Sequence, residues 1–110
     1  MKKILMFAVL LAGAFTLASC QAAEETFKIA MITDVGDVDD KSFNQGTWEG
    51  IVEWAEENNE THKYYKPTEV SDDAYLAAID LAVAGGAEIV VTPGFLFEAA
   101  IYNAQTKYPE

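Results

Sequence analysis

Apolar residues follow two alternating patterns along this chain, and the patterns predict strands and helices in turn. Short runs rich in β-branched and aromatic residues predict three strands, at residues 27–33, 62–66 and 89–92. Longer stretches with apolar residues three or four positions apart predict three helices, at residues 42–58, 71–84 and 96–104. The first and third strands are apolar enough to be buried on both faces, whereas the second is polar and suits the edge of a sheet.

Regular alternation of strand and helix predicts an α/β fold with a doubly wound parallel sheet. The short connections favour right-handed crossovers, for which we expect the strand order 2-1-3. In that order the helices after the first and third strands leave towards opposite faces, so the loops after these strands frame a crevice at the carboxyl edge. We therefore expect a ligand at Asp34–Lys41 and Pro93–Gly94.

Polar residues at the expected helix starts support these boundaries. Ser42 and Gln45 have the spacing of a capping box at the start of the first helix, and Ser71 is the expected N-cap of the second. Phe95 and Phe97, at the start of the third helix, are expected to pack in the core, although Phe95 directly follows the crevice loop.

The first twenty residues resemble a bacterial lipoprotein signal. Two lysines precede a fifteen-residue apolar run, residues 4–18, which is too short to span a bilayer comfortably and leads into Leu-Ala-Ser-Cys20. In this lipobox pattern the Cys20 thiol receives a diacylglyceryl group and becomes the new N-terminus after cleavage. We expect a signal peptide at 1–19, a lipid-anchored tether at 20–26 and a body at 27–110. The alternative is an ordinary secretory signal with an incidental cysteine.

Acidic residues dominate the body of the protein. Cleavage before Cys20 removes two of the seven basic residues and none of the 18 acidic ones, so five basic residues remain and the net charge becomes −13. Phosphate backbones and anionic lipid surfaces repel such a charge, so we expect no nucleic-acid partner and no polybasic membrane adhesion. Because Cys20 is the only cysteine, its lipidation leaves no thiol for a disulfide, a metal site or a nucleophile.

The loop after the first strand is dense in carboxylates, with Asp34, Asp37, Asp39 and Asp40 within seven residues. A calcium-binding loop is disfavoured because its sixth position is Asp39 instead of glycine and its twelfth is Gln45 instead of glutamate. Phosphate binding is disfavoured because the glycine-rich patterns are absent and the acids would repel the phosphate. We therefore expect no metal and no cofactor, and favour uncharged polar ligands over nucleotides.

The same loop suits recognition of a sugar or a nucleoside. Asp34 can accept hydrogen bonds from a diol or from ring N–H groups, Asn44 can donate and accept, and Phe43 could stack on a flat ring. The alternative interpretation is structural: Asp39 or Asp40 caps the helix, Phe43 is a core residue and the other acids are solvated.

Residues 32–50 resemble the signature of the basic membrane protein family, the purine nucleoside receptor A-like substrate-binding lipoproteins of ABC transporters. The specific part is Asp-Asp-Lys-Ser-Phe-Asn at residues 39–44, and Val-Thr-Pro-Gly-Phe at 91–95 agrees with it, as does the lipobox. This resemblance implies a type 1 periplasmic-binding-protein fold, in which two α/β lobes joined by a hinge hold a nucleoside between them.

Carried over to this sequence, the resemblance implies four ligand-binding residues. Asp34 matches the ligand-binding aspartate of the family, Phe43 its base-stacking aromatic residue, Asn44 a polar neighbour and Gly94 a binding-loop position. Asp37 departs from the pattern, because it stands where members often have a second glycine, and this substitution would stiffen the loop.

The resemblance implies a lipid-anchored, extracytoplasmic substrate-binding protein of an ABC transporter and not an enzyme. Its implied partners are a purine nucleoside, the transporter permease and, through Cys20, the membrane. Two alternatives stay open: an exported metal-dependent α/β enzyme that uses Asp34 and Asp37, and a surface lipoprotein that acts as an adhesin. Because the third strand would have an open apolar edge, we expect an incomplete N-terminal lobe, with further ligand residues of the family beyond Glu110.

Overall fold

A three-stranded parallel sheet lies at the centre of the computed structural model, which describes residues 26–109. The middle strand, β1 (Ile29–Ile32), pairs with β2 (His62–Tyr65) on one side and with β3 (Ile89–Val91) on the other. Ile29 lies opposite both His62 and Ile89. The expected strand order 2-1-3 and the parallel pairing are confirmed, and each strand is shorter than the apolar run that predicted it.

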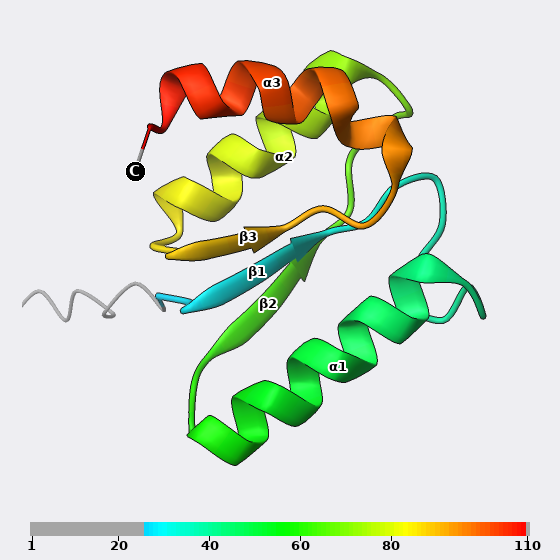
Figure 1. The fold of residues 1–110 in the computed structure, drawn as a ribbon. Coiled ribbons are helices and arrows are strands. Elements are labelled where there is room, and N and C mark those ends of the chain that lie inside the picture. Colours follow the sequence, from blue (N-terminus) through cyan, green and yellow to red (C-terminus); the bar gives the residue numbers. More distant parts are fainter. Residues whose placement is uncertain (1–25, 110) are drawn as a thin grey trace, which may run out of the picture.

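Helices cover both faces of the sheet (Figure 1). One face is covered by α1 (Phe43–Asn58), and the other by α2 (Asp72–Ala84) and α3 (Glu98–Lys107). A short 3-10 helix, η1 (Phe95–Phe97), leads directly into α3. Since a parallel strand must be reached by a connection that crosses back over the sheet, each β-α-β step places a helix on one face. The predicted α/β fold class is confirmed.

Apolar clusters lie on both faces of β1. Ala30 and Ile32 belong to the cluster under α2 and α3, while Ile29 and Met31 belong to the cluster under α1, as the alternation of side chains along a strand requires. All four residues of β1 are buried. Complete burial of a side chain such as Met31 or Ile32 stabilises the folded state by about 1.5–3 kcal/mol.

The start of α1 differs from the capping box expected from the sequence. Ser42 is the N-cap residue, but its side chain makes no capping hydrogen bond. Asp40 caps the helix in its place, because Asp40 Oδ1 accepts from the backbone N–H groups of Ser42 at 2.8 Å and Gln45 at 3.0 Å. The capping-box prediction is wrong, and the alternative in which Asp40 caps the helix is confirmed. The cap of α2 is as predicted, with Ser71 Oγ accepting from the N–H of Ala74 at 3.2 Å.

The two phenylalanines of η1 have opposite environments. Phe97 is 1% exposed and packs on the Tyr75 ring, with 4.6 Å between the ring centroids, so its predicted core position is confirmed. Phe95 is 83% exposed, and the prediction that it packs in the core is wrong. Its position directly after Gly94, where the chain turns sharply into η1, directs this side chain to solvent.

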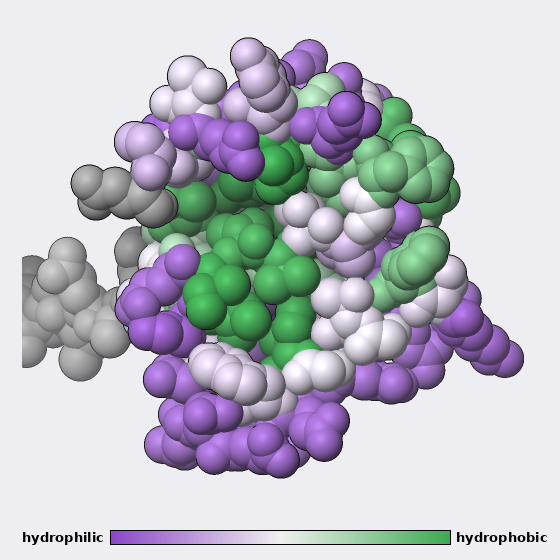
Figure 2. Space-filling model, in the orientation of Figure 1, coloured by the Kyte–Doolittle hydropathy of each residue, from purple (hydrophilic) through white to green (hydrophobic). Residues whose placement is uncertain are grey.

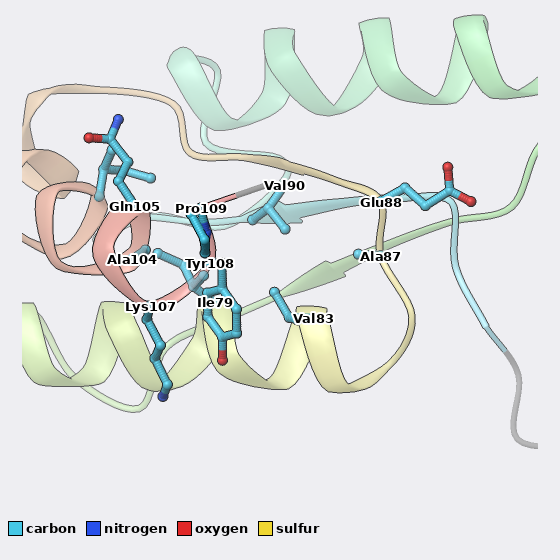
Figure 3. A pocket seen from close by; sticks show the side chains of 11 residues that line it. Ile79, Val83, Ala87, Glu88, Val90, Ala104, Gln105, Lys107, Tyr108 and Pro109 are labelled. Atoms are coloured by element: carbon cyan, nitrogen blue, oxygen red, sulfur yellow. The ribbon is translucent and has the colours of Figure 1, made fainter.

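The outer edge of β3 borders an apolar area of the surface (Figure 2). Ile89 of β3 is 44% exposed, and its neighbours Glu88 and Val90 line a hollow of about 470 Å³. Figure 3 shows that side chains of α2, β3 and α3 surround this hollow, among them Val83 and Val90, together with Tyr108 directly after α3. No residue of the loop after β1 lines it, so it is separate from the predicted ligand crevice.

The predicted lipoprotein signal, with Cys20 and most of the tether, lies outside the described residues. Within residues 26–109, none of the helices has the length and apolar character needed to cross a bilayer.

Candidate functional site

The loops that follow β1 and β3 meet at the carboxyl edge of the sheet. Asp34 is the second residue after β1, and its Oδ2 oxygen lies 3.8 Å from the position that a Cβ would take on Gly94. Gly94 has a φ of +111°, which residues with a side chain rarely adopt. The structure thus brings two of the sequence-predicted residues face to face from two separate loops.

Asn44 ties the loop after β1 to the first turn of α1. Its side chain is fully buried, and its Nδ2 group donates to Asp34 Oδ1 at 2.7 Å and to Asp40 Oδ2 at 2.9 Å. The Asn44 Oδ1 oxygen accepts from the backbone N–H of Asp34 at 3.2 Å. Both hydrogens of the amide are therefore used inside the protein. In this arrangement Asn44 orients Asp34, and it has no free N–H group for a ligand.

One oxygen of the Asp34 carboxylate stays available. Asp34 Oδ1 accepts from Asn44 and also from the backbone N–H of Gly36 at 3.0 Å. Asp34 Oδ2 has no hydrogen-bond partner among residues 26–109 and faces Gly94. A carboxylate held by one oxygen and open at the other is a preorganised acceptor for a hydroxyl or a ring N–H group.

Gly36 is required by the close packing of this loop. A Cβ at Gly36 would lie 2.8 Å from Asn44 Nδ2 and 2.9 Å from Asp40 Oδ2, closer than carbon approaches either atom. The Asn44 amide and the Asp40 carboxylate therefore approach the backbone at Gly36 more closely than a side chain there would allow.

Asp40 is held in its charged form by the groups it caps. Burial tends to raise its pKa, but hydrogen bonds from the backbone amides of Gln45 and Ser42 and from the Asn44 side chain outweigh that effect and lower the pKa below its usual value. Two negative charges, Asp34 and Asp40, are thus bridged by one neutral amide donor.

Asp37 connects the loop to the neighbouring strand instead of facing the crevice. Its Oδ2 accepts from Lys66 Nζ at 2.7 Å, and Lys66 directly follows β2. The hydrogen bond from Lys66 lowers the pKa of Asp37, and the same bond raises the pKa of Lys66. A glycine at position 37 could not make this ion pair, so the departure from the family pattern adds a link between two loops of the carboxyl edge.

Phe43 presents its ring to solvent at the start of α1. It is 68% exposed, so the alternative interpretation that placed it in the core is wrong. Phe43 directly precedes Asn44, whose side chain holds Asp34, and this places an exposed aromatic ring on the element that fixes the carboxylate. Exposed aromatic rings next to a polar acceptor are typical of sites for flat ligands with hydroxyl groups.

Two hydroxyl groups near this edge were not singled out by sequence reasoning. Thr33 Oγ1, next to Asp34, and the hydroxyl of Tyr75, in the first turn of α2, are buried without a hydrogen-bond partner among the described residues. Tyr75 fits the apolar side of its helix, and the sequence pattern therefore identifies it only as a core residue. The spacing of apolar residues along a helix does not indicate whether a buried hydroxyl group has a hydrogen-bond partner.

Metal ligands do not gather at this site. Within residues 26–109 the structure contains no group of three or more His, Cys, Asp or Glu side chains placed to hold a metal ion. The four carboxylates of the loop instead bond to backbone amides, to Asn44 or to Lys66, apart from that of Asp39, which is exposed.

Comparison with known proteins gives a match over almost the whole described region. The family model of the PnrA-like substrate-binding proteins of ABC transporters, Bmp, matches residues 27–110. The ABC transporter nucleoside-binding protein BmpA of Lactococcus lactis is 30% identical in an alignment that covers all of this chain and 35% of that relative.

Two further relatives come from Listeria. The CD4+ T-cell-stimulating antigens of Listeria monocytogenes and Listeria innocua are each 30% identical over 80% of this chain and 26% of their own length. The chain thus spans about a quarter to a third of the length of these relatives.

Proposed function

Because the chain belongs to the Bmp family of PnrA-like ABC transporter substrate-binding proteins, we propose that the complete protein captures a purine nucleoside for uptake. The observation that carries the proposal is that, within residues 26–109, only one of the two oxygens of the Asp34 carboxylate accepts hydrogen bonds. One oxygen is fixed by Asn44 and Gly36, and the other faces Gly94 in the loop after β3. A neutral ligand with vicinal hydroxyls or ring N–H groups matches this acceptor, and an anionic nucleotide does not.

Each of the four site residues has a separate task in this proposal. Asp34 accepts a hydrogen bond from the nucleoside, and Phe43 stacks on its base. Gly94 lets the ligand approach the backbone closely, because a side chain there would face the Asp34 carboxylate. Asn44 holds Asp34 in place and so acts on the ligand indirectly.

The relatives give independent support for the ligand class. The Lactococcus relative is named for nucleoside binding, and its alignment includes the whole loop from Asp34 to Asn44. Substrate-binding families of ABC transporters are not a class of enzymes. In the loop after β1, the carboxylate of Asp37 is held by Lys66, and that of Asp40 by Asn44 and backbone amides.

The test is a calorimetric titration of guanosine, adenosine, inosine and cytidine into the complete protein without residues 1–19. We expect saturable binding of purine nucleosides and its loss in Asp34→Ala. Asp39→Ala is the matched control, because Asp39 lies in the same loop, is exposed and makes no side-chain hydrogen bond among the described residues. A folded protein that binds none of the four would overturn the proposal.

We also propose that Cys20 anchors the protein to the membrane from its extracytoplasmic side, where it delivers the nucleoside to the permease. The support is the sequence pattern of two lysines, an apolar run and Leu-Ala-Ser-Cys20. Metabolic labelling with palmitate tests the anchor. We expect label in the wild type and none in Cys20→Ser, and an unlabelled wild-type protein would contradict it.

A further inference from the structure

Asp37 holds the loop after β1 from the side of β2. Both oxygens of its carboxylate are used: Oδ1 accepts from the backbone N–H of Val38 at 2.9 Å, and Oδ2 accepts from Lys66 Nζ at 2.7 Å. Lys66 directly follows β2, so the ion pair joins the loop that carries Asp34 to a second strand of the sheet. This contact is separate from the bonds that Asn44 makes on the side of α1.

The backbone of Lys66 is a fixed point from which its side chain can hold the loop. The carboxyl ends of β1 and β2 lie side by side (Figure 1), and their pairing continues one residue further, because the N–H of Thr33 donates to the carbonyl of Tyr65 at 3.0 Å. Pro67 follows Lys66, and a proline restricts the residue before it to extended backbone conformations. The ion pair therefore ties the loop to a well-defined position at the edge of the sheet.

Asp37 lies between the groups that orient the Asp34 carboxylate. The residue before it, Gly36, donates its backbone N–H to Asp34 Oδ1 at 3.0 Å. The backbone carbonyl of Asp37 accepts from the N–H of Asp40 at 3.2 Å, and Asp40 in turn accepts from the Asn44 amide. A displacement of Asp37 would therefore disturb the bonds that fix Asp34.

We propose that Asp37 and Lys66 are positioning residues for ligand binding, whose ion pair holds the loop after β1 in the conformation that binds the nucleoside. Neither residue touches the ligand. Without the pair, the loop populates further conformations in which Asp34 is not oriented, and the affinity falls by the fraction of the protein that remains competent to bind. This proposal rests on the nucleoside-binding function proposed above.

The exposure of the pair sets the size of the expected effect. The side chains of Lys66 and Asp37 are 54% and 40% exposed, and exposed ion pairs contribute little energy. We expect Asp37→Asn to weaken inosine binding by the complete protein about 2- to 5-fold. Asparagine keeps an oxygen that can accept from Val38 and removes the negative charge. Lys66→Met should lose the same factor, and the double variant no more, because all three break the same pair.

Salt provides a readout that a role in packing would not change. Inosine is uncharged, so salt does not screen an attraction between the protein and this ligand. Between about 0.01 and 1 M salt the screening length falls from about 30 to about 3 Å, which weakens exposed ion pairs. We expect the affinity of the wild type to fall over this range towards that of Asp37→Asn, while the affinity of the variant stays constant.

Lys107→Met is the matched control. Lys107 Nζ donates to Asp80 Oδ2 at 2.7 Å, and this pair has a similar exposure but joins α3 to α2 instead of holding the loop after β1. The control should leave both the inosine affinity and its salt dependence as in the wild type. Calorimetric titration at each salt concentration measures the affinity, and urea denaturation checks that every variant is folded.

Three results would overturn the proposal. Equal inosine affinity of the wild type and Asp37→Asn at low salt would show that the pair does not position the loop, and would leave the nucleoside function intact. A much larger loss in Lys66→Met than in Asp37→Asn would make Lys66 a direct ligand contact. A wild-type protein that binds no nucleoside would overturn this proposal together with the proposed function.

Discussion

The Asn44 amide donates a hydrogen bond of 2.7 Å to Asp34 Oδ1, and this bond joins the first turn of α1 to the second residue after the central strand. The same nitrogen donates to Asp40 at 2.9 Å, so a single side chain orients two carboxylates. The geometry of the proposed ligand acceptor is therefore built into the fold, and binding would not have to create it.

Replacement of Asn44 should lower stability and affinity together. In Asn44→Ala, Asp34 and Asp40 lose their shared donor, and a polar network in a buried position is opened. We expect the free energy of unfolding to fall by about 1–3 kcal/mol, measured by urea denaturation. Asn103→Ala, on the exposed side of α3, is the matched control and should change the free energy by less than about 0.5 kcal/mol. An unchanged stability of Asn44→Ala would mean that the network contributes little.

Gly36→Ala should disturb the loop through sterics alone. Its Cβ would lie 2.8 Å from Asn44 Nδ2, so the amide must shift away from Asp34. We expect a loss of both stability and nucleoside affinity. Gly46→Ala, in the interior of α1 with open space around the added methyl group, is the opposite case and should stabilise the protein by about 0.5–1 kcal/mol. If both glycine variants behave alike, the close packing at Gly36 is not the cause.

Phe43→Ala should weaken nucleoside binding and leave the stability of the fold almost unchanged. The ring is 68% exposed, so its loss should leave the free energy of unfolding almost unchanged. Stacking of a base on an aromatic ring contributes about 1–3 kcal/mol, so we expect nucleoside affinity to fall about 5- to 150-fold in a calorimetric titration. Tyr102→Ala removes another exposed ring, on α3, and should not affect affinity. Full affinity in Phe43→Ala would exclude Phe43 from the site.

Lowering the pH should destabilise the folded protein through protonation of Asp40, which caps α1. The pKa of Asp40 lies below its usual value in the folded protein, so below about pH 4 the unfolded chain binds more protons than the folded one. Its contribution to stability is therefore complete above that pH and is lost as the pH falls through the lowered pKa. We expect urea denaturation at several pH values to show a shallower acid decline for Asp40→Asn than for the wild type. Parallel declines would assign the acid sensitivity to other carboxylates.

Topology could be predicted from the sequence because it depends on order and periodicity. The strand order 2-1-3 follows from alternating elements and crossover handedness, and the buried side chains of β1 follow from its continuous apolar run. These properties depend on many residues together, so a wrong expectation for one residue does not change them.

Individual side chains at the site could not be assigned in the same way. Ser42 has the spacing of a capping residue, but the carboxylate of Asp40 takes that role because it reaches both backbone amides. The sequence predicts Asn44 at the ligand, and this stays a prediction; what the pattern does not predict is that the side chain is buried and donates to Asp34. Phe95 and Phe97 are alike in sequence, and only the short turn of η1 decides which one is buried.

The pairing of β1 has a consequence for how the chain folds. The central strand is the first to be synthesised, yet Ile29 must find partners at His62 and at Ile89, 33 and 60 residues away. Each pairing closes a long loop before it gains any hydrogen bond, which slows folding relative to proteins with local contacts. The sheet should therefore form late and cooperatively, and the amide hydrogens of β1 should be the last to exchange with solvent.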